Sequence, residues 1–382
     1  MQYVTGAAND HYDVLDKLRL FLIDMGFTIH SYVTDQNIWY PAGNTVSAKG
    51  TVNQKRLHAS KGGRCLNFRS FDSISSPHSY RPFNGPYASW FSYPTASLPG
   101  ICFNVGDGYN AAHPWCSQPG TPNWATLSAS GLNADAVAEG GGRGAGVAIT
   151  IPGAVASYHF FYQDAPFLLW VGIEWAVGKF QHLMCCDLDK SGSYDGGLFF
   201  TGSCAGETVG VFSTPSEKEA PFCYSYNNMF LKLLSHPDGD AGWGRPWMRS
   251  RTMCYGNSSS YSTPLFSLSG GYDYWLPVSP KLASATDRDH DEGAAAALNM
   301  LLGASPTTLN GVAPLPPIFV NCTRANDRIS LLGVIPDVFQ FTSEKPVDKG
   351  EIQYGGKTYV TLPLNWFVSG KSRNLYFAIR KV

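Results

Sequence analysis

The sequence lacks the short motifs that mark the commonest enzyme and metal sites. It contains no GxSxG, no HExxH and no CxxC, and its acids form no paired-carboxylate signature. These absences argue against nucleophilic hydrolases, zinc peptidases, zinc ribbons and thioredoxin-like enzymes. We therefore predict that the protein is not an enzyme, and we assign it no catalytic residue, cofactor or metal.

Charge and long apolar runs are also scarce. Only 15% of the residues are charged and the formal net charge is -1, so nothing favours attraction to nucleic acid or to an anionic membrane. No apolar run reaches the roughly 18 residues that a membrane helix needs, and no basic segment followed by an apolar core opens the sequence. We expect no nucleic-acid partner, no membrane insertion and no standard secretory signal.

The nine cysteines form an odd set that includes the adjacent pair Cys185 and Cys186. A complete intrachain disulfide framework cannot be built from such a set. Reduced, buried thiols are the expected state.

Aromatic residues, glycine and proline are abundant. The aromatic share is 14%, with 40 glycines and 25 prolines. This composition is typical of many short strands joined by tight turns. The predicted fold class is mainly β, with antiparallel sheets in a sandwich-like arrangement and an N-terminal helix in a small α+β module.

The clearest helix signal lies near the N-terminus. Leu15, Leu18, Leu22 and Met25 repeat at steps of three and four residues, an Asn-Asp pair precedes them, and Gly26 follows. Short aromatic and β-branched runs come next and predict a small sheet over the apolar stripe of the helix. We place an α+β module, expected to anchor the protein, at residues 1–75, and a β-rich body with long ordered loops at 76–382.

The strongest strand signal runs from residue 156 to 203. Larger apolar residues alternate with Trp170, Gly172 and Glu174, and hairpins are expected at Gly178 and, near the C-terminus, at Gly355-Gly356. The pattern favours a half-covered sheet with Glu174 facing solvent, although a buried Glu174 with a raised pKa is the alternative. His159 and His182 are candidate cross-strand neighbours with packing roles. A second helix is expected where acids precede an Ala- and Leu-rich run, at residues 287–304.

The stretch "DLDKSGSYDGGL" has the spacing of a calcium loop in its first half only. Asp187, Asp189 and Asp195 stand at oxygen-donor positions, but Leu198 occupies the position that needs a bidentate glutamate. These aspartates are weak metal candidates. The favoured interpretation is a hairpin tip whose aspartates bond their own backbone.

Aromatic clusters supply the candidate interface or ligand residues. Trp243, Trp247, Tyr272 and Trp275 lie in Gly- and Pro-rich surroundings. Large rigid rings serve protein interfaces and sugar stacking alike, because both uses need contact area at low entropic cost. The protein-interface role is the more frequent one.

Three stretches together resemble tailed-bacteriophage virion proteins of the tail or baseplate. They are "TGAANDHYDVLDKLRLFL", "YHFFYQD" with "GKFQHLMCCDLDKSGSYDGGLFFTGS", and "LLGVIPDVFQF" with "EIQYGGKTYVTLPL" and "YFAIRKV". The regions from about 76 to 150 and from 205 to 320 lie outside the resemblance. It implies a structural protein of the virion, assembled in the host cytoplasm, with copies of itself and other virion proteins as partners.

Three alternatives stay open at this point. One is a tail-tip protein that attaches to a host-surface receptor or glycan through the aromatic clusters. Another is a capsid decoration protein, which would share the β-rich and weakly charged character. The last is a glycan hydrolase that uses Glu174 or the aspartates between 187 and 195.

Overall fold

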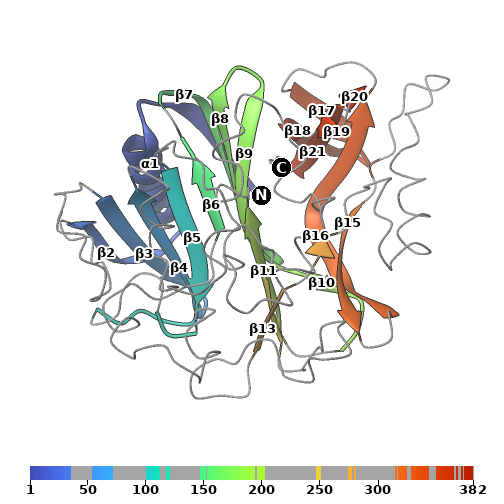
Figure 1. Ribbon diagram of the computed structural model, residues 1–382, viewed down its shortest axis with the longest axis horizontal. Helices are drawn as coiled ribbons and strands as arrows, with labels where there is room; N and C mark the ends of the chain where they lie inside the picture. Colours follow the sequence, from blue (N-terminus) through green and yellow to red (C-terminus); the bar gives the residue numbers. More distant parts are fainter. Residues whose placement is uncertain are drawn as a thin grey trace, which may run out of the picture.

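A computed structural model gives the fold. It describes residues 1–35, 54–71, 100–111, 118–120, 147–151, 153–193, 196–202, 247–250, 274–277, 279–280, 315, 317–324, 328–343, 350–364, 367–368, 371–372 and 374–381. Every strand pairing within these residues is antiparallel, and three large sheets stand side by side with a single described helix near the N-terminus (Figure 1). The predicted mainly β, sandwich-like fold class is confirmed.

The central sheet has seven strands. Its order is β1-β7-β8-β9-β11-β12-β13, so the first strand of the chain lies at one edge beside a strand about 150 residues away in sequence. The strands are β1 (Gln2–Ala8), β7 (Val155–Asp164), β8 (Phe167–Ala176), β9 (Lys179–Asp187), β11 (Gly196–Gly202), β12 (Trp247–Ser250) and β13 (Tyr274–Pro277).

The second sheet, here called the helix-side sheet, has five strands in sequence order. With helix α1 (His11–Asp24) it covers one face of the central sheet. The strands are β2 (Thr28–Asp35), β3 (Gln54–Lys61), β4 (Arg64–Phe71), β5 (Gly100–Gly106) and β6 (Val147–Thr150).

The third, C-terminal sheet covers the opposite face of the central sheet. Its order is β14-β15-β16-β21-β18-β17, and β10 (Asp189–Lys190) joins β16 from the side. The strands are β14 (Ser279–Pro280), β15 (Pro317–Arg324), β16 (Arg328–Ser343), β17 (Gly350–Tyr354), β18 (Lys357–Leu364) and β21 (Asn374–Arg380); β19 (Phe367–Val368) and β20 (Lys371–Ser372) form a separate pair.

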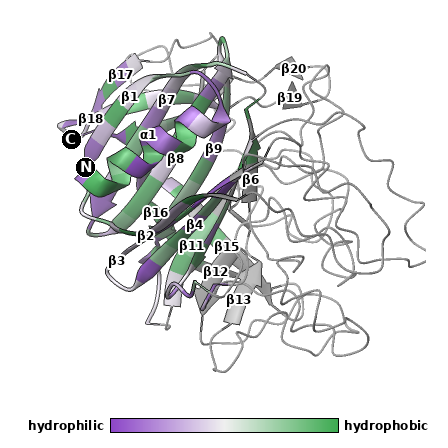
Figure 2. Cartoon of the chain, turned by 90° about the vertical axis from the view of Figure 1, so that its left-hand side faces the viewer, coloured by the Kyte–Doolittle hydropathy of each residue, from purple (hydrophilic) through white to green (hydrophobic). Residues whose placement is uncertain are grey.

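The central sheet therefore buries both faces. In β8, Leu169 and Val171 belong to the core shared with α1 and the helix-side sheet, whereas Leu168 and Trp170 belong to the core shared with the C-terminal sheet. Hydrophobic stretches accordingly run along β7, β8 and β9 behind α1 (Figure 2). The expected half-covered sheet is wrong, because a second layer covers the face of β8 that carries Trp170, Gly172 and Glu174.

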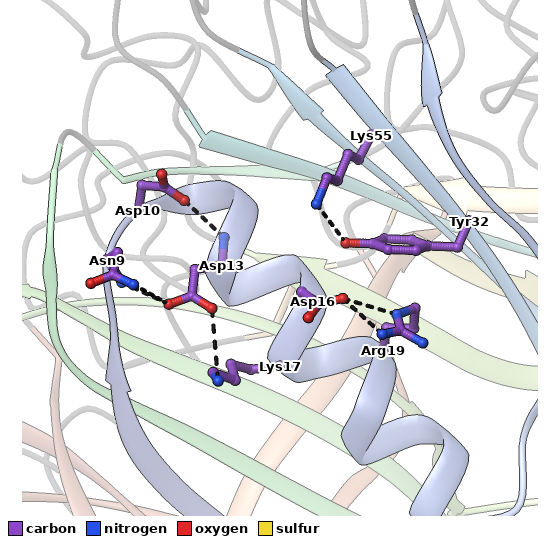
Figure 3. A network of polar contacts seen from close by, with 8 residues as sticks. All are labelled: Asn9, Asp10, Asp13, Asp16, Lys17, Arg19, Tyr32 and Lys55. Atoms are coloured by element: carbon purple, nitrogen blue, oxygen red, sulfur yellow. Dashed lines mark hydrogen bonds and ion pairs between the residues drawn. The ribbon is translucent and has the colours of Figure 1, made fainter.

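Helix α1 matches its sequence signals. Asp10 is the N-cap and accepts a hydrogen bond from the Asp13 backbone N–H at 2.8 Å, and Gly26 follows with a φ of 79°. Arg19 pairs with Asp16 at 2.9 Å and lies over the ring of Tyr32, whose hydroxyl accepts from Lys55 (Figure 3). Arg19 thus connects the helix to β2, and the bond between Lys55 and Tyr32 connects β3 to β2.

The domain boundary at residue 75 stays a prediction, but the strand order crosses it. β5 and β6 complete the sheet that contains β2 to β4, and β1 pairs with β7. The hairpins at Gly178 and at Gly355-Gly356 are confirmed, with positive φ at all three glycines. The expected second helix at 287–304 lies outside the described residues. Among those described, no helix combines the length and apolar character needed to cross a membrane.

Candidate functional site

A row of four polar side chains, three buried and one, Tyr3, partly buried, lies on the face of the central sheet that the C-terminal sheet covers. The Tyr3 hydroxyl lies 2.8 Å from His159 Nδ1, His159 Nε2 lies 3.0 Å from Ser157 Oγ, and Ser157 Oγ lies 2.5 Å from Glu174 Oε2. Glu174 Oε1 accepts from the Gly178 backbone N–H at 2.9 Å. Strands β1, β7 and β8 thus supply one continuous hydrogen-bonded row.

Glu174 corrects the sequence-based interpretation. Its side chain was expected to face solvent, yet the residue is only 4% exposed. The register places it opposite Ser157 on β7, and the tight turn after β8 brings the Gly178 N–H to its other oxygen. A buried acid is tolerated because both carboxyl oxygens receive hydrogen bonds.

When Glu174 is a carboxylate, each side-chain hydrogen bond of this row is donated toward it. Ser157 donates to Glu174, His159 Nε2–H donates to Ser157, and His159 Nδ1 is left to accept from Tyr3. Burial raises the pKa of Tyr3, which keeps its hydroxyl a donor. Serine stands between the acid and the imidazole and is 8% exposed, so its oxygen is not presented to a substrate as a hydrolytic nucleophile is.

His159 and His182 are not directly opposite each other. Each pairs with Gly172 from its own side of β8. A Cβ at Gly172 would lie 2.8 Å from Leu362 Cδ1, so the glycine makes room for a leucine of the C-terminal sheet between the two histidines. The predicted packing role agrees with this arrangement.

His182 is fixed as a neutral imidazole. Its Nδ1 accepts from Trp170 Nε1–H at 3.2 Å, and its Nε2–H donates to the Pro363 carbonyl at 3.1 Å. The side chain is completely buried, and this burial lowers its pKa to about 3.

The aspartate-rich stretch links all three sheets. Asp187 ends β9 and forms a two-pronged ion pair with Arg64 of β4, while Asp189 opens β10, which pairs with β16. The predicted β9–β11 hairpin is confirmed, but the Asp187 side chain bonds Arg64 of the helix-side sheet and not the backbone of its own turn. Asp195 lies outside the described residues, and among those described no cluster of three His, Cys, Asp or Glu side chains is placed to bind a metal.

Two of the four aromatic candidates have a described backbone. Trp247 of β12 pairs with Pro277 of β13, and Trp275 of β13 pairs with Arg249. The two tryptophans therefore stand on neighbouring strands, two residues apart in register. Trp243 and Tyr272 lie outside the described residues.

An open cleft of about 520 Å³ was missed by sequence reasoning. Its lining comes from four distant segments, which are the start of β1, the end of α1, the β7–β8 turn and the end of β21. Its charged walls are largely paired within the protein. Asp164 binds Lys61 at 2.7 Å, and Arg380 binds Asp337 at 3.2 Å. No local motif signals such a cleft, because it depends on long-range strand order.

No protein-family model matches the sequence, and no curated protein matches it.

Proposed function

We propose that the protein is a structural component of a bacteriophage particle, in the tail or baseplate, that acts by self-association and by docking to neighbouring virion proteins. The phage context rests on the resemblance of the three sequence stretches. The structural role is supported by one observation above the others. The titratable side chains Glu174, His159 and His182 are at most 4% exposed. Glu174 and His159 are hydrogen-bonded within the central sheet, and His182 joins that sheet to the Pro363 carbonyl of the C-terminal sheet.

Electron cryomicroscopy of intact particles tests this proposal. Density for the chain in the tail or baseplate is the expected result. Density on the head shell would instead favour the decoration protein. A chain that is absent from particles and stays monomeric at high concentration would contradict the proposal.

The host-attachment alternative has one observation of its own, the neighbouring positions of Trp247 and Trp275 on β12 and β13. The register puts the two positions on one face of the sheet, and indole rings are a common stacking surface for sugars. If this alternative holds, replacing both tryptophans with alanine abolishes adsorption to host cells while particle assembly continues. Normal adsorption by the double variant would exclude it.

A further inference from the structure

We infer that the outer edge of β1 is the surface through which two copies of this chain associate, by antiparallel pairing of β1 with the β1 of the second copy. The inference rests on the proposed function, which requires contacts between copies, and it identifies where one such contact lies. Four observations on β1 carry it.

The first observation is that β1 lies at the edge of the central sheet. In the part of the chain that the structure describes, β1 is the terminal strand of this sheet and pairs only with β7. Gln2, Val4, Thr5 and Ala7 are exposed along it, and Val4 is 41% exposed. The main-chain N–H and C=O groups on the outer side of an edge strand form a ready template for another strand.

The second observation is chemical. Charged residues and proline commonly protect an edge strand against pairing with another chain. The sequence of β1, QYVTGAA, contains neither. Among the edge strands in the described part of the chain, β1 is the longest that lacks both. By contrast β2 carries Asp35, β17 carries Glu351, and β13 ends in a proline.

The third observation is rigidity. One face of β1 contacts α1. On the other face, the ring of Tyr3 stacks on Phe161 at 4.6 Å, its hydroxyl bonds His159, and the Lys381 ammonium lies 5.6 Å from the ring centre. A strand already held on both faces loses little conformational freedom when it pairs, so association costs less.

The fourth observation concerns the partner, a second copy of the chain. A two-fold contact between identical edges is necessarily antiparallel. It places an uncharged strand opposite the same uncharged strand, so no like charges meet. The bulge between Gly6 and Ala8 limits regular pairing to Gln2–Gly6.

Sedimentation velocity over a range of concentrations, on the full chain, tests the inference. Val4→Lys places a charge on the edge, and we expect it to weaken self-association by about tenfold or more. Val4→Thr keeps a β-branched, uncharged side chain and should associate as the wild type does. Gln353→Lys, on the edge strand β17, is the control for a charge on another edge and should have no effect.

Amide hydrogen exchange provides a second readout that needs no variant. In the wild type, the amides of Gln2–Gly6 should become more protected as concentration rises. If the wild type associates while Val4→Lys behaves normally and β1 gains no protection, the edge inference is wrong and the proposed function is untouched. A wild type that is monomeric at every concentration also overturns the inference, but the proposed function fails only if the chain is absent from particles as well. Should Val4→Lys not fold, the exchange measurement alone decides.

Discussion

At the scale of single residues, Gly172 shows how closely the central and C-terminal sheets approach. Leu362 occupies the space where a Gly172 side chain would be, between His159 and His182. We predict that Gly172→Ala destabilises the protein by about 1–3 kcal/mol, because the new methyl group must push the leucine away within a close-packed interior. Urea denaturation measures the change.

The matched control for this substitution is Gly153→Ala, since an added Cβ at Gly153 meets nothing within 4 Å. It should stay within roughly 0.5 kcal/mol of the wild type. Equal changes in the free energy of unfolding for the two substitutions would show that displacing Leu362 does not destabilise the protein.

The buried histidines predict a loss of stability in acid. Burial lowers the pKa of His182 to about 3 and that of His58 to about 4, whereas in the unfolded chain both titrate near the ordinary histidine value of about 6.5. Between these values the unfolded state binds more protons than the folded state, so stability falls as pH falls. Each histidine contributes a slope of about 1.4 kcal/mol per pH unit near pH 5, and the contribution of His58 falls to about half of this value at pH 4, where it is half protonated in the folded state.

His182→Gln should reduce this slope by the contribution of one histidine, whatever it does to stability at neutral pH. The measurement is the unfolding free energy from urea titrations at pH 7, 6, 5 and 4. A parallel pH dependence in the variant and the wild type would mean that His182 takes up its proton in the folded state as well.

Glu174 shows what the sequence can and cannot predict about a residue. The alternating pattern of β8 correctly predicted which side of the strand Glu174 occupies. It did not predict that this side is covered, because the covering strands, β18 and β21, lie nearly 200 residues further along the chain. A local pattern gives the face of a strand, whereas burial depends on a layer that the pattern does not contain.

At the scale of elements, the connection between β9 and β11 fastens the central sheet to both of its neighbours. Arg64 pairs with Asp187, and β10 adds to β16, where Gly333 is the register partner of Lys190. A Cβ at Gly333 would collide with the backbone carbonyl of Asp189, and a backbone atom cannot rotate away as a side chain can. We predict that Gly333→Ala breaks the β10–β16 pairing and increases hydrogen exchange at the Ser191 amide, which donates to the Leu332 carbonyl.

Gly192→Ala, in the same connection, is the control, because a Cβ there meets nothing within 4 Å. Unchanged exchange at Ser191 in Gly333→Ala would show that β10 can shift without losing its partner.

The elements themselves were largely predictable from local signals. Three signals that span only a few residues each are confirmed. They are the apolar stripe of α1 with its Asp10 cap, the turn at Gly178 and the turn at Gly355-Gly356. The pairing of β1 with β7 was not predictable, because nothing within QYVTGAA specifies a partner about 150 residues away. The candidate site depends on that pairing, since it brings Tyr3 to His159.

At the scale of the whole molecule, the three sheets share two cores, and the central sheet contributes to both. The described buried Ala, Val, Leu and Phe residues among the first 75 belong to a core that they share with residues further along the chain. Phe21 of α1 packs against Phe160 of β7, and Phe68 of β4 stacks on Phe103 of β5. The expected N-terminal module therefore shares its apolar contacts with residues beyond its boundary.

We predict that a fragment of residues 1–75 does not fold alone, because it loses the β4–β5 and β1–β7 pairings together with the apolar surface that they bury. Nuclear magnetic resonance spectra of the fragment should show the narrow amide dispersion of an unfolded chain. Produced together with a fragment of residues 76–382, it should be captured and protected from proteolysis, since the pairings can form again between the two pieces. A dispersed spectrum from the isolated fragment would establish an independent N-terminal domain, and the contacts of Phe21 and Phe68 across the boundary would then be a docking interface between two folded units.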